Sequence, residues 1–120
     1  MPESVENLEI WQEAVEIVRI VYELTKSWPR EEMYGLTSQI RRAAISIPAN
    51  IAEGVGRGGP GEMSRFAQIA LGSLYELDTL LYLGAELKYA SQTEVAAVRD
   101  RVTLLAKRTS SFIRYQEDRR

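Results

Sequence analysis

The sequence predicts an all-α protein folded as an antiparallel up-and-down four-helix bundle with a proline-kinked second helix. Apolar residues recur at steps of three and four in four stretches, at about 7–26, 36–53, 60–88 and 92–115. No stretch shows the apolar–polar alternation typical of a strand. The connections between the stretches are short and contain Gly, Pro or Ser. We therefore expect a single domain over residues 1–120.

The first predicted helix has an unusually wide apolar surface. Asn7 is placed to cap it and Glu9 lies in its first turn. Two adjacent stripes run along it: Leu8, Trp11, Val15, Val18 and Tyr22, and beside them Ile10, Ala14, Ile17 and Val21. Together they cover an arc of about 180°, whereas one core contact needs only about 100°. The residues leave two alternatives open, a helix covered by its own bundle and by another subunit, or one packed between two neighbours of the same chain.

The second predicted helix carries Pro48 in its interior. A proline there removes a backbone donor, clashes with the carbonyl of Ala44 and costs about 3 kcal/mol. We therefore expect the helix to bend at Pro48 and the protein to make use of this bend. The predicted core face consists of Ile40, Ala44, Ile47 and Ile51. The opposite face offers a polar patch for an oligomer interface: Arg42, Ser46, Pro48, Asn50 and Glu53. Ser46 or Asn50 would also satisfy backbone groups that Pro48 leaves unpaired, and we expect both roles.

The third and fourth predicted helices share a heptad-like seam. Pro60 is a favoured first-turn residue for the third helix, and Ser91 with Glu94 forms a capping box that opens the fourth. The seam of the third helix is Phe66, Ala70, Ser73, Leu77, Leu80, Gly84 and Leu87. The seam of the fourth is Val95, Val98, Val102, Leu105, Thr109 and Phe112. Small residues in the third helix allow close approach of a neighbouring helix.

The composition excludes several kinds of metal site and the usual catalytic base. The chain has no cysteine and no histidine, which removes thiolate metal sites, the usual general base and the Glu-x-x-His ligands of carboxylate-bridged metal sites in bundles. We therefore expect no catalytic residues, no metal site and no cofactor. The acidic, polar start is unlike a signal peptide, and no apolar run approaches the roughly 20 residues that span a bilayer. We expect a cytoplasmic protein with no membrane partner.

Residues 54–59, GVGRGG, match the letters of the dinucleotide-binding fingerprint. That fingerprint must follow a strand, whereas this segment follows a helix, so we interpret it as a helix–helix turn. A weaker hypothesis remains, that free amides at the start of the next helix hold a phosphate or sulfate beside Arg57 and Arg65.

The formal net charge is −2, but bases gather in residues 36–75 and 99–120. Such a chain is not a general polyanion binder, although two local basic surfaces remain. The candidate phosphate or nucleic-acid contacts are Arg41, Arg57, Arg65, Arg101, Lys107 and Arg108. Ordinary solvated side chains are the alternative interpretation for all of them.

Three segments carry a family resemblance: residues 8–29, LEIWQEAVEIVRIVYELTKSWP, residues 34–54, YGLTSQIRRAAISIPANIAEG, and residues 56–89. They resemble the bacterial four-helix-bundle proteins first noticed in intervening sequences of ribosomal RNA genes. The resemblance covers about residues 7–113 and is most specific in IPANIAEG. It implies an up-and-down bundle that assembles into a homopentameric ring or barrel. The accessory variability protein of diversity-generating retroelements has a similar fold and binds nucleic acid and a reverse transcriptase through a basic surface.

From these observations we expect a non-enzymatic homo-oligomer, a pentamer by resemblance, that acts as an adaptor or scaffold. The alternative is a nucleic-acid-binding accessory protein, associated with a reverse transcriptase or with structured RNA. The slightly acidic composition favours the first hypothesis, because phosphate contacts need clustered Arg and Lys. An acid–base hydrolase that uses glutamates has no positive support in the sequence.

Overall fold

A computed structural model describes residues 3–120 of the chain. Four long helices make up most of it, and no strand occurs in this described part, so the all-α four-helix bundle is confirmed. The elements are α1 (Glu3–Glu6), α2 (Glu9–Thr25), the 3₁₀ turn η1 (Arg30–Glu32), α3 (Leu36–Arg57), α4 (Pro60–Glu86) and α5 (Gln92–Asp118). None of these helices is long and apolar enough to cross a membrane.

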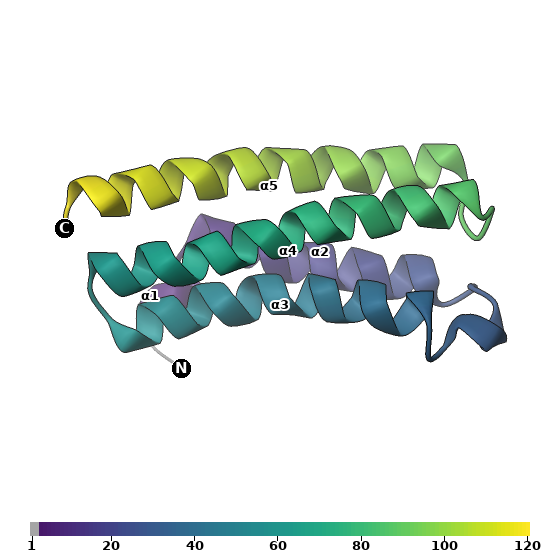
Figure 1. Cartoon of the computed structure of the whole chain (residues 1–120), viewed down its shortest axis with the longest axis horizontal. Coiled ribbons are helices and arrows are strands. Elements are labelled where there is room, and N and C mark those ends of the chain that lie inside the picture. The colour runs from purple at the N-terminus through teal and green to yellow at the C-terminus, as the bar shows by residue number, and fades with distance from the viewer. Residues whose placement is uncertain (1–2) are drawn as a thin grey trace.

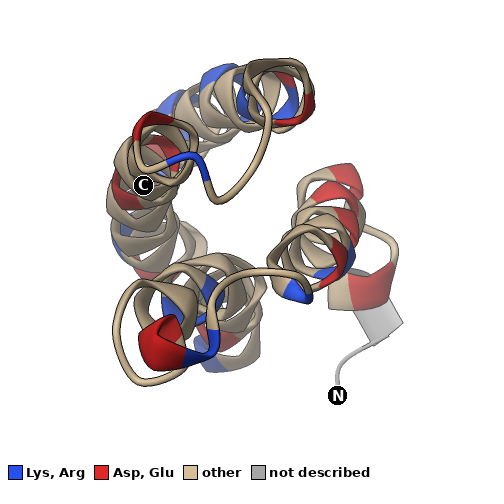
Figure 2. Cartoon of the chain, turned by 90° about the vertical axis from the view of Figure 1, so that its right-hand side faces the viewer, with Lys and Arg blue, Asp and Glu red and all other residues tan. Residues whose placement is uncertain are grey.

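The four long helices lie around a common axis. Figure 1 shows successive helices pointing in opposite directions along the long dimension of the molecule. In the end-on view of Figure 2 they follow one another in the order α2, α3, α4 and α5 around the centre. The α3–α4 and α4–α5 pairs pack most extensively, and α2 contacts both α3 and α5. Each helix therefore has two neighbours in the same chain.

The core confirms most of the periodicity read from the sequence. Every residue of the predicted α3 core face is buried, and the predicted α4 and α5 seams are buried over most of their length. Leu87 is the main exception, because it lies just past the end of α4 and is 51% exposed. The largest completely buried apolar side chains come from all four helices: Ile17, Val21, Ile40, Ile47, Leu74, Leu77, Leu81 and Leu105. Their burial supplies the main driving force for folding.

The two apolar stripes of α2 differ in how deeply they are buried. Ile10, Ala14, Ile17 and Val21 point into the core, whereas the neighbouring stripe is half-buried and Tyr22 is exposed. This second stripe lies on the flank that faces α3. There the guanidinium of Arg41 lies 4.5 Å from the centre of the Tyr22 ring, and its Nε donates to Thr25 Oγ1 at 2.9 Å. Within the chain α2 thus packs between α3 and α5, and part of its second stripe remains accessible.

Some helix ends agree with the sequence prediction and others differ from it. The prediction that Asn7 caps the first helix is wrong, because Leu8 is the N-cap of α2 and makes no side-chain cap bond. Pro60 does open α4, and the Ser91–Glu94 capping box opens α5. The second predicted helix continues beyond residue 53 to Arg57. Gly54 lies inside the helix, and its missing side chain lets α4 approach, since a Cβ there would lie 3.0 Å from that of Phe66.

Pro48 does not interrupt α3, which is one continuous helix from Leu36 to Arg57. The bend that we expect at Pro48 therefore remains a prediction. The sharp change of direction comes ten residues later, at Gly58 and Gly59. Their φ angles of +81° and +86° are ones that side-chain-bearing residues rarely adopt. The GVGRGG segment is thus the end of a helix and a turn, and it follows no strand.

The other end of the bundle is closed by an aromatic clasp made of Trp28, Glu32, Gly84 and Tyr89. Trp28 is buried, and its ring centre lies 5.7 Å from that of Tyr89. The indole fits against α4 because Gly84 has no side chain, since a Cβ on this residue would lie only 2.6 Å from Trp28 Cη2. Tyr89 donates its hydroxyl hydrogen to Glu32 Oε2 at 2.8 Å, and the Leu36 amide donates to Glu32 Oε1 at 3.0 Å.

We expect the clasp to make stability sensitive to acid. The Leu36 amide and, to a smaller extent, the Tyr89 hydroxyl hold the pKa of Glu32 below its ordinary value. A carboxylate with a lowered folded pKa stabilises the protein above its unfolded pKa, and this stabilisation disappears as the pH falls through the folded pKa. Glu32→Gln should therefore flatten the loss of thermal stability between about pH 5 and pH 3.

Thermal melts of both proteins across this pH range would test the prediction. Glu31→Gln is the matched control, since Glu31 is exposed and makes no side-chain hydrogen bond to another described residue. Identical acid profiles for Glu32→Gln and the unmodified protein would contradict the proposed link.

Candidate functional site

The polar patch predicted on the second helix is divided between two environments. Ser46 and Asn50 are half-buried in the contact between α3 and α4, where Ser46 Oγ lies 2.8 Å from Ser73 Oγ. Asn50 Nδ2 donates to the Ser46 carbonyl at 2.8 Å and to Ser46 Oγ at 2.9 Å. The amide therefore bonds to Ser46 and not to the Ala44 carbonyl opposite Pro48. These two residues join helices of one chain, and their predicted position opposite the core is wrong.

The remaining members of the patch lie closer to solvent. Arg42 is exposed, and its Nη2 lies 3.5 Å from Ser38 Oγ. Glu53 is exposed and accepts a 2.8 Å bond from Arg57 Nε. Pro48 is half-buried on the flank of α3 that faces α2. The five residues therefore do not form one continuous polar surface.

The candidate phosphate contacts at the glycine-rich turn are paired with acids. The guanidinium groups of Arg57 and Arg65 lie 4.9 and 5.0 Å from the centre of the Phe66 ring. Glu62 lies between them, 3.6 Å from Arg57 and 3.4 Å from Arg65. The hydrogen bond to Glu53 is the main reason why the pKa of Arg57 is raised. With two carboxylates beside two guanidiniums, this turn is not a strongly positive anion site.

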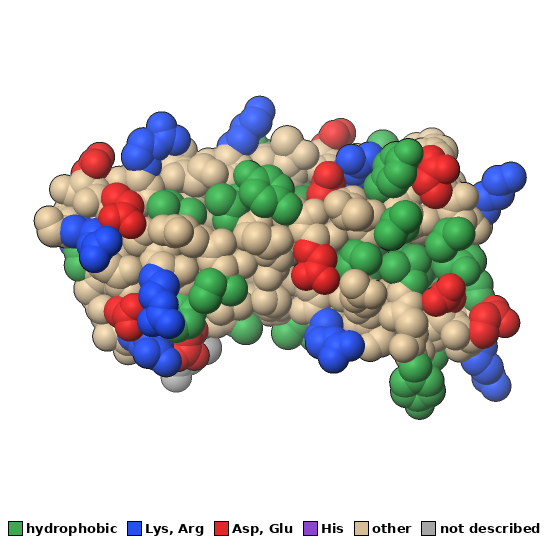
Figure 3. All heavy atoms as spheres, viewed as in Figure 1, with side chains coloured by type: hydrophobic (Ala, Val, Ile, Leu, Met, Phe, Trp, Pro, Cys, Tyr) green, Lys and Arg blue, Asp and Glu red, His purple; other side chains and the backbone are tan. Residues whose placement is uncertain are grey.

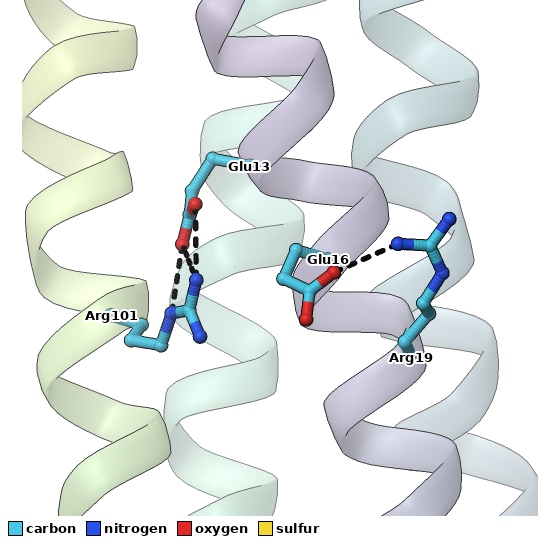
Figure 4. Close-up of polar contacts among 4 residues, drawn as sticks. All are labelled: Glu13, Glu16, Arg19 and Arg101. Atoms are coloured by element: carbon cyan, nitrogen blue, oxygen red, sulfur yellow. Dashed lines mark hydrogen bonds and ion pairs between the residues drawn. The ribbon is translucent and has the colours of Figure 1, made fainter.

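Arg101 connects two helices. Its Nε and Nη2 donate to Glu13 Oε1 and Oε2 at 2.9 and 3.2 Å, which ties α5 to α2 (Figure 4). The same view shows that Glu16 instead pairs with Arg19 along α2 itself. Both pairs are partly exposed, so each contributes at most about 1 kcal/mol to stability. Arg101 is therefore less available to a ligand than the sequence suggests, and Arg41 is likewise engaged with Tyr22 and Thr25.

Lys107 and Arg108 have no acidic partner within 4 Å among the described residues. They follow each other on α5, and both line a groove of about 520 Å³ between α5 and the start of α2. The lining of this groove is Leu8, Glu9, Ile10, Lys107, Arg108, Ser111, Phe112 and Tyr115. Lys107 also reaches the opposite flank of α5.

The groove on that opposite flank, between α4 and α5, encloses about 400 Å³ and is called the α4–α5 groove here. Its lining is Leu74, Tyr75, Asp78, Val102, Thr103, Ala106, Lys107, Ser110, Ser111 and Arg114. Leu74, Val102 and Ala106 supply the apolar part. Hydroxyl groups, two bases and one phenol ring supply the polar part. Figure 3 shows hydrophobic, basic and acidic side chains interspersed on this side of the molecule.

The single acid of the α4–α5 groove is neutralised. Arg99 Nε and Nη2 donate to Asp78 Oδ1 and Oδ2 at 2.8 and 3.2 Å. This hydrogen bonding is the main reason why the pKa of Arg99 is raised. Lys107 and Arg114 therefore set the sign of the potential in the groove, and neither pairs with an acid among residues 3–120.

The sequence predicts only part of this groove. Lys107 is among the predicted contacts, whereas Arg114, Tyr75 and Ser110 are not. The spacing of seven residues between Lys107 and Arg114 was an available signal, because it puts both on one helix face. Tyr75 belongs to another helix, and only the α4–α5 register brings it near.

No group of three or more acidic side chains that could hold a metal ion occurs in the part of the chain that the structure describes.

The fold and surface define a four-helix-bundle protein with a basic flank on its last helix. The family model described as 23S rRNA-intervening sequence protein matches residues 6–111, and the chain belongs to this family. It is similar in structure to a protein of unknown function from the S23 ribosomal protein family of Bacteroides thetaiotaomicron. That comparison has a TM-score of 0.78 and 24% sequence identity, and it covers 88% of this chain and 95% of the other. No curated protein matches the chain.

Proposed function

We propose that this protein is a non-enzymatic homo-oligomer that serves as an adaptor or scaffold. The observation that carries the proposal is an apolar seam on the outside of the bundle, which α2 and α3 form together. Its residues are Trp11, Val15, Val18, Tyr22, Ile45 and Pro48.

The register of α2 and α3 places these residues side by side. Arg41 contacts both Tyr22 and Thr25, so these parts of α2 and α3 are level. Because the helices run in opposite directions, Val18 comes level with Ile45 about one turn further along. Ile45 is 43% exposed, and Val18 is half-buried. The seam is therefore continuous along more than two turns of α2.

A second copy of the chain is the occupant that we propose for the seam. Contiguous exposed apolar surface is uncommon on monomers and marks interaction sites. The wide apolar arc of α2 is then explained by two contacts, one with the core and one with another subunit. Five copies is the number that the family resemblance implies. A ring of this kind uses the same head-to-tail contact between each pair of neighbours.

Light scattering coupled to size-exclusion chromatography, on purified protein at tens of micromolar, tests the assembly. We expect a mass close to five times that of one chain, and a strict monomer over this range would contradict the proposal. The adaptor role requires a further partner, which co-purification from the native cell would identify.

Nucleic-acid binding is a second candidate, favoured by one observation. From residue 101 to residue 116, α5 carries four bases and no acid. Arg101 is paired with Glu13, which leaves Lys107, Arg108 and Arg114 to contact phosphates. Each neutralised phosphate adds roughly 0.9 to the slope of log affinity against log salt on duplex DNA.

Three contacts per chain would give a slope near −2.7. Gel-shift titrations with duplex DNA and structured RNA at two salt concentrations measure that slope. Absence of binding at low salt would remove this candidate.

A further inference from the structure

The α4–α5 groove has the size and chemistry of a small-ligand site. Its volume of about 400 Å³ lies in the range of about 300–1,000 Å³ typical of such sites. It combines an apolar floor with convergent polar groups, as ligand sites do. This inference does not depend on the assembly proposed above, because one chain supplies the entire groove.

The charges that line the groove favour a negatively charged ligand. Lys107 and Arg114 line it without an acidic partner among the described residues, and Arg99 neutralises Asp78. Between the two bases, Ser110 and Ser111 add hydroxyl groups that can donate hydrogen bonds. Arg and hydroxyl donors together suit phosphate oxygens, which accept several hydrogen bonds at once.

The ring of Tyr75 in the groove favours a ligand that itself contains a flat ring. Tyr75 lines the groove and is 60% exposed, so most of its surface is open to solvent. A nucleobase can stack on such a ring whichever base it is, because every base has a flat π-face. An anion without a ring would leave Tyr75 unused.

The register of α4 and α5 sets the order of these groups. The Asp78–Arg99 and Ser64–Glu117 bonds fix the two helices against each other. They place Tyr75 near the level of Thr103. Lys107 follows Thr103 after about 6 Å, and Arg114 lies about 10 Å beyond Lys107. A ligand with a ring at one end and several negative charges at the other would therefore contact Tyr75, Lys107 and Arg114 in that order along the groove.

We propose that the α4–α5 groove binds a nucleoside di- or triphosphate, with its base on Tyr75 and its phosphates between Lys107 and Arg114. The hydroxyl groups of Ser110 and Ser111 donate to phosphate oxygens. The same chemistry occurs in free nucleotides and in single-stranded nucleic acid, and the experiment separates the two sources.

Isothermal titration calorimetry of the full chain with ADP, and separately with a short oligodeoxythymidine, tests the proposal. Arg114→Ala and Lys107→Ala should each weaken ADP binding about tenfold or more, as expected for loss of a charged hydrogen bond. Tyr75→Leu should weaken it about five- to tenfold. All three positions lie on helix surfaces, and circular dichroism melts would verify that each variant folds.

Two variants serve as matched controls. Arg30→Ala makes the same charge change on the exposed turn η1, outside the groove. Tyr82→Leu removes another exposed tyrosine of α4 that does not line the groove. Both should bind ADP as the unmodified protein does.

The outcomes separate the possibilities. Binding of ADP with losses confined to the three groove variants supports a free nucleotide as the ligand. Binding of the oligonucleotide alone, with the same pattern of losses, supports the groove and assigns its ligand to a nucleic-acid strand. Equal losses in Arg30→Ala and Arg114→Ala would show diffuse attraction by net charge and overturn the proposal. Absence of binding to both probes at low salt would also overturn it.

Discussion

Replacement of Trp28 by alanine is expected to lower the free energy of unfolding by about 3–5 kcal/mol. Trp28 is only 6% exposed, and its indole closes one end of the bundle between Gly84 and Tyr89. Its removal forfeits a large apolar burial and leaves a cavity that rigid helices on either side cannot fill. Part of the loss is offset because Trp28 Nε1 is buried and has no hydrogen-bond partner among residues 3–120. Urea denaturation followed by circular dichroism measures the change.

A double-mutant cycle with Gly84→Ala shows whether the clasp is the cause. The added Cβ would lie 2.6 Å from Trp28 Cη2 and 2.8 Å from Cζ2, so the single variant should cost about 1–3 kcal/mol by overpacking. Once the indole is gone, the same methyl group has room. The double variant should therefore be no less stable than Trp28→Ala alone, and additive losses would show that the two residues do not share the site.

Ile45→Glu is expected to dissociate the proposed assembly, weakening self-association roughly 100-fold or more. Ile45 is 43% exposed in the single chain, so a charge there should leave the fold intact. In a packed seam the same carboxylate would be buried without a partner, which is costly. Sedimentation velocity over a concentration series measures the change in association.

Leu104→Glu is the matched control for Ile45→Glu. Leu104 is 50% exposed, and it lies on α5, away from the apolar seam. The same substitution there should leave the association unchanged. If both variants dissociate the oligomer equally, or if neither does, the interface does not lie on the seam.

The bundle could be predicted from the sequence because its signals are local. The 3.6-residue periodicity around Ile47 and Leu77, Pro60 at the start of α4 and the capping box of Ser91 each depend on a few neighbouring residues. The structure confirms all of these. Local signals also placed the turn after α3 correctly, although the helix runs through Gly54 to Arg57, and no local pattern reveals the close contact of Gly54 with α4.

The sites could not be predicted to the same degree, because they depend on which flank of a helix its neighbours cover. A single core face was assumed for α3, so Ser46 and Asn50 seemed to point outward. In fact α4 covers their flank, and Ser73 bonds to Ser46. The α4–α5 groove likewise requires the register between Tyr75 and Lys107, which the sequence of either helix alone does not contain.

The aromatic clasp also has a consequence for the order of folding. The Tyr89–Glu32 bond joins residues 57 positions apart, and Trp28 meets Gly84 across a similar separation. Loops of this length must close before such contacts form, which is slow compared with local helix formation. The connection between α2 and α3 should therefore remain unprotected until α4 has docked. In pulse-labelling hydrogen exchange, amides around η1 should gain protection together with the last turn of α4 and after the middle of α3.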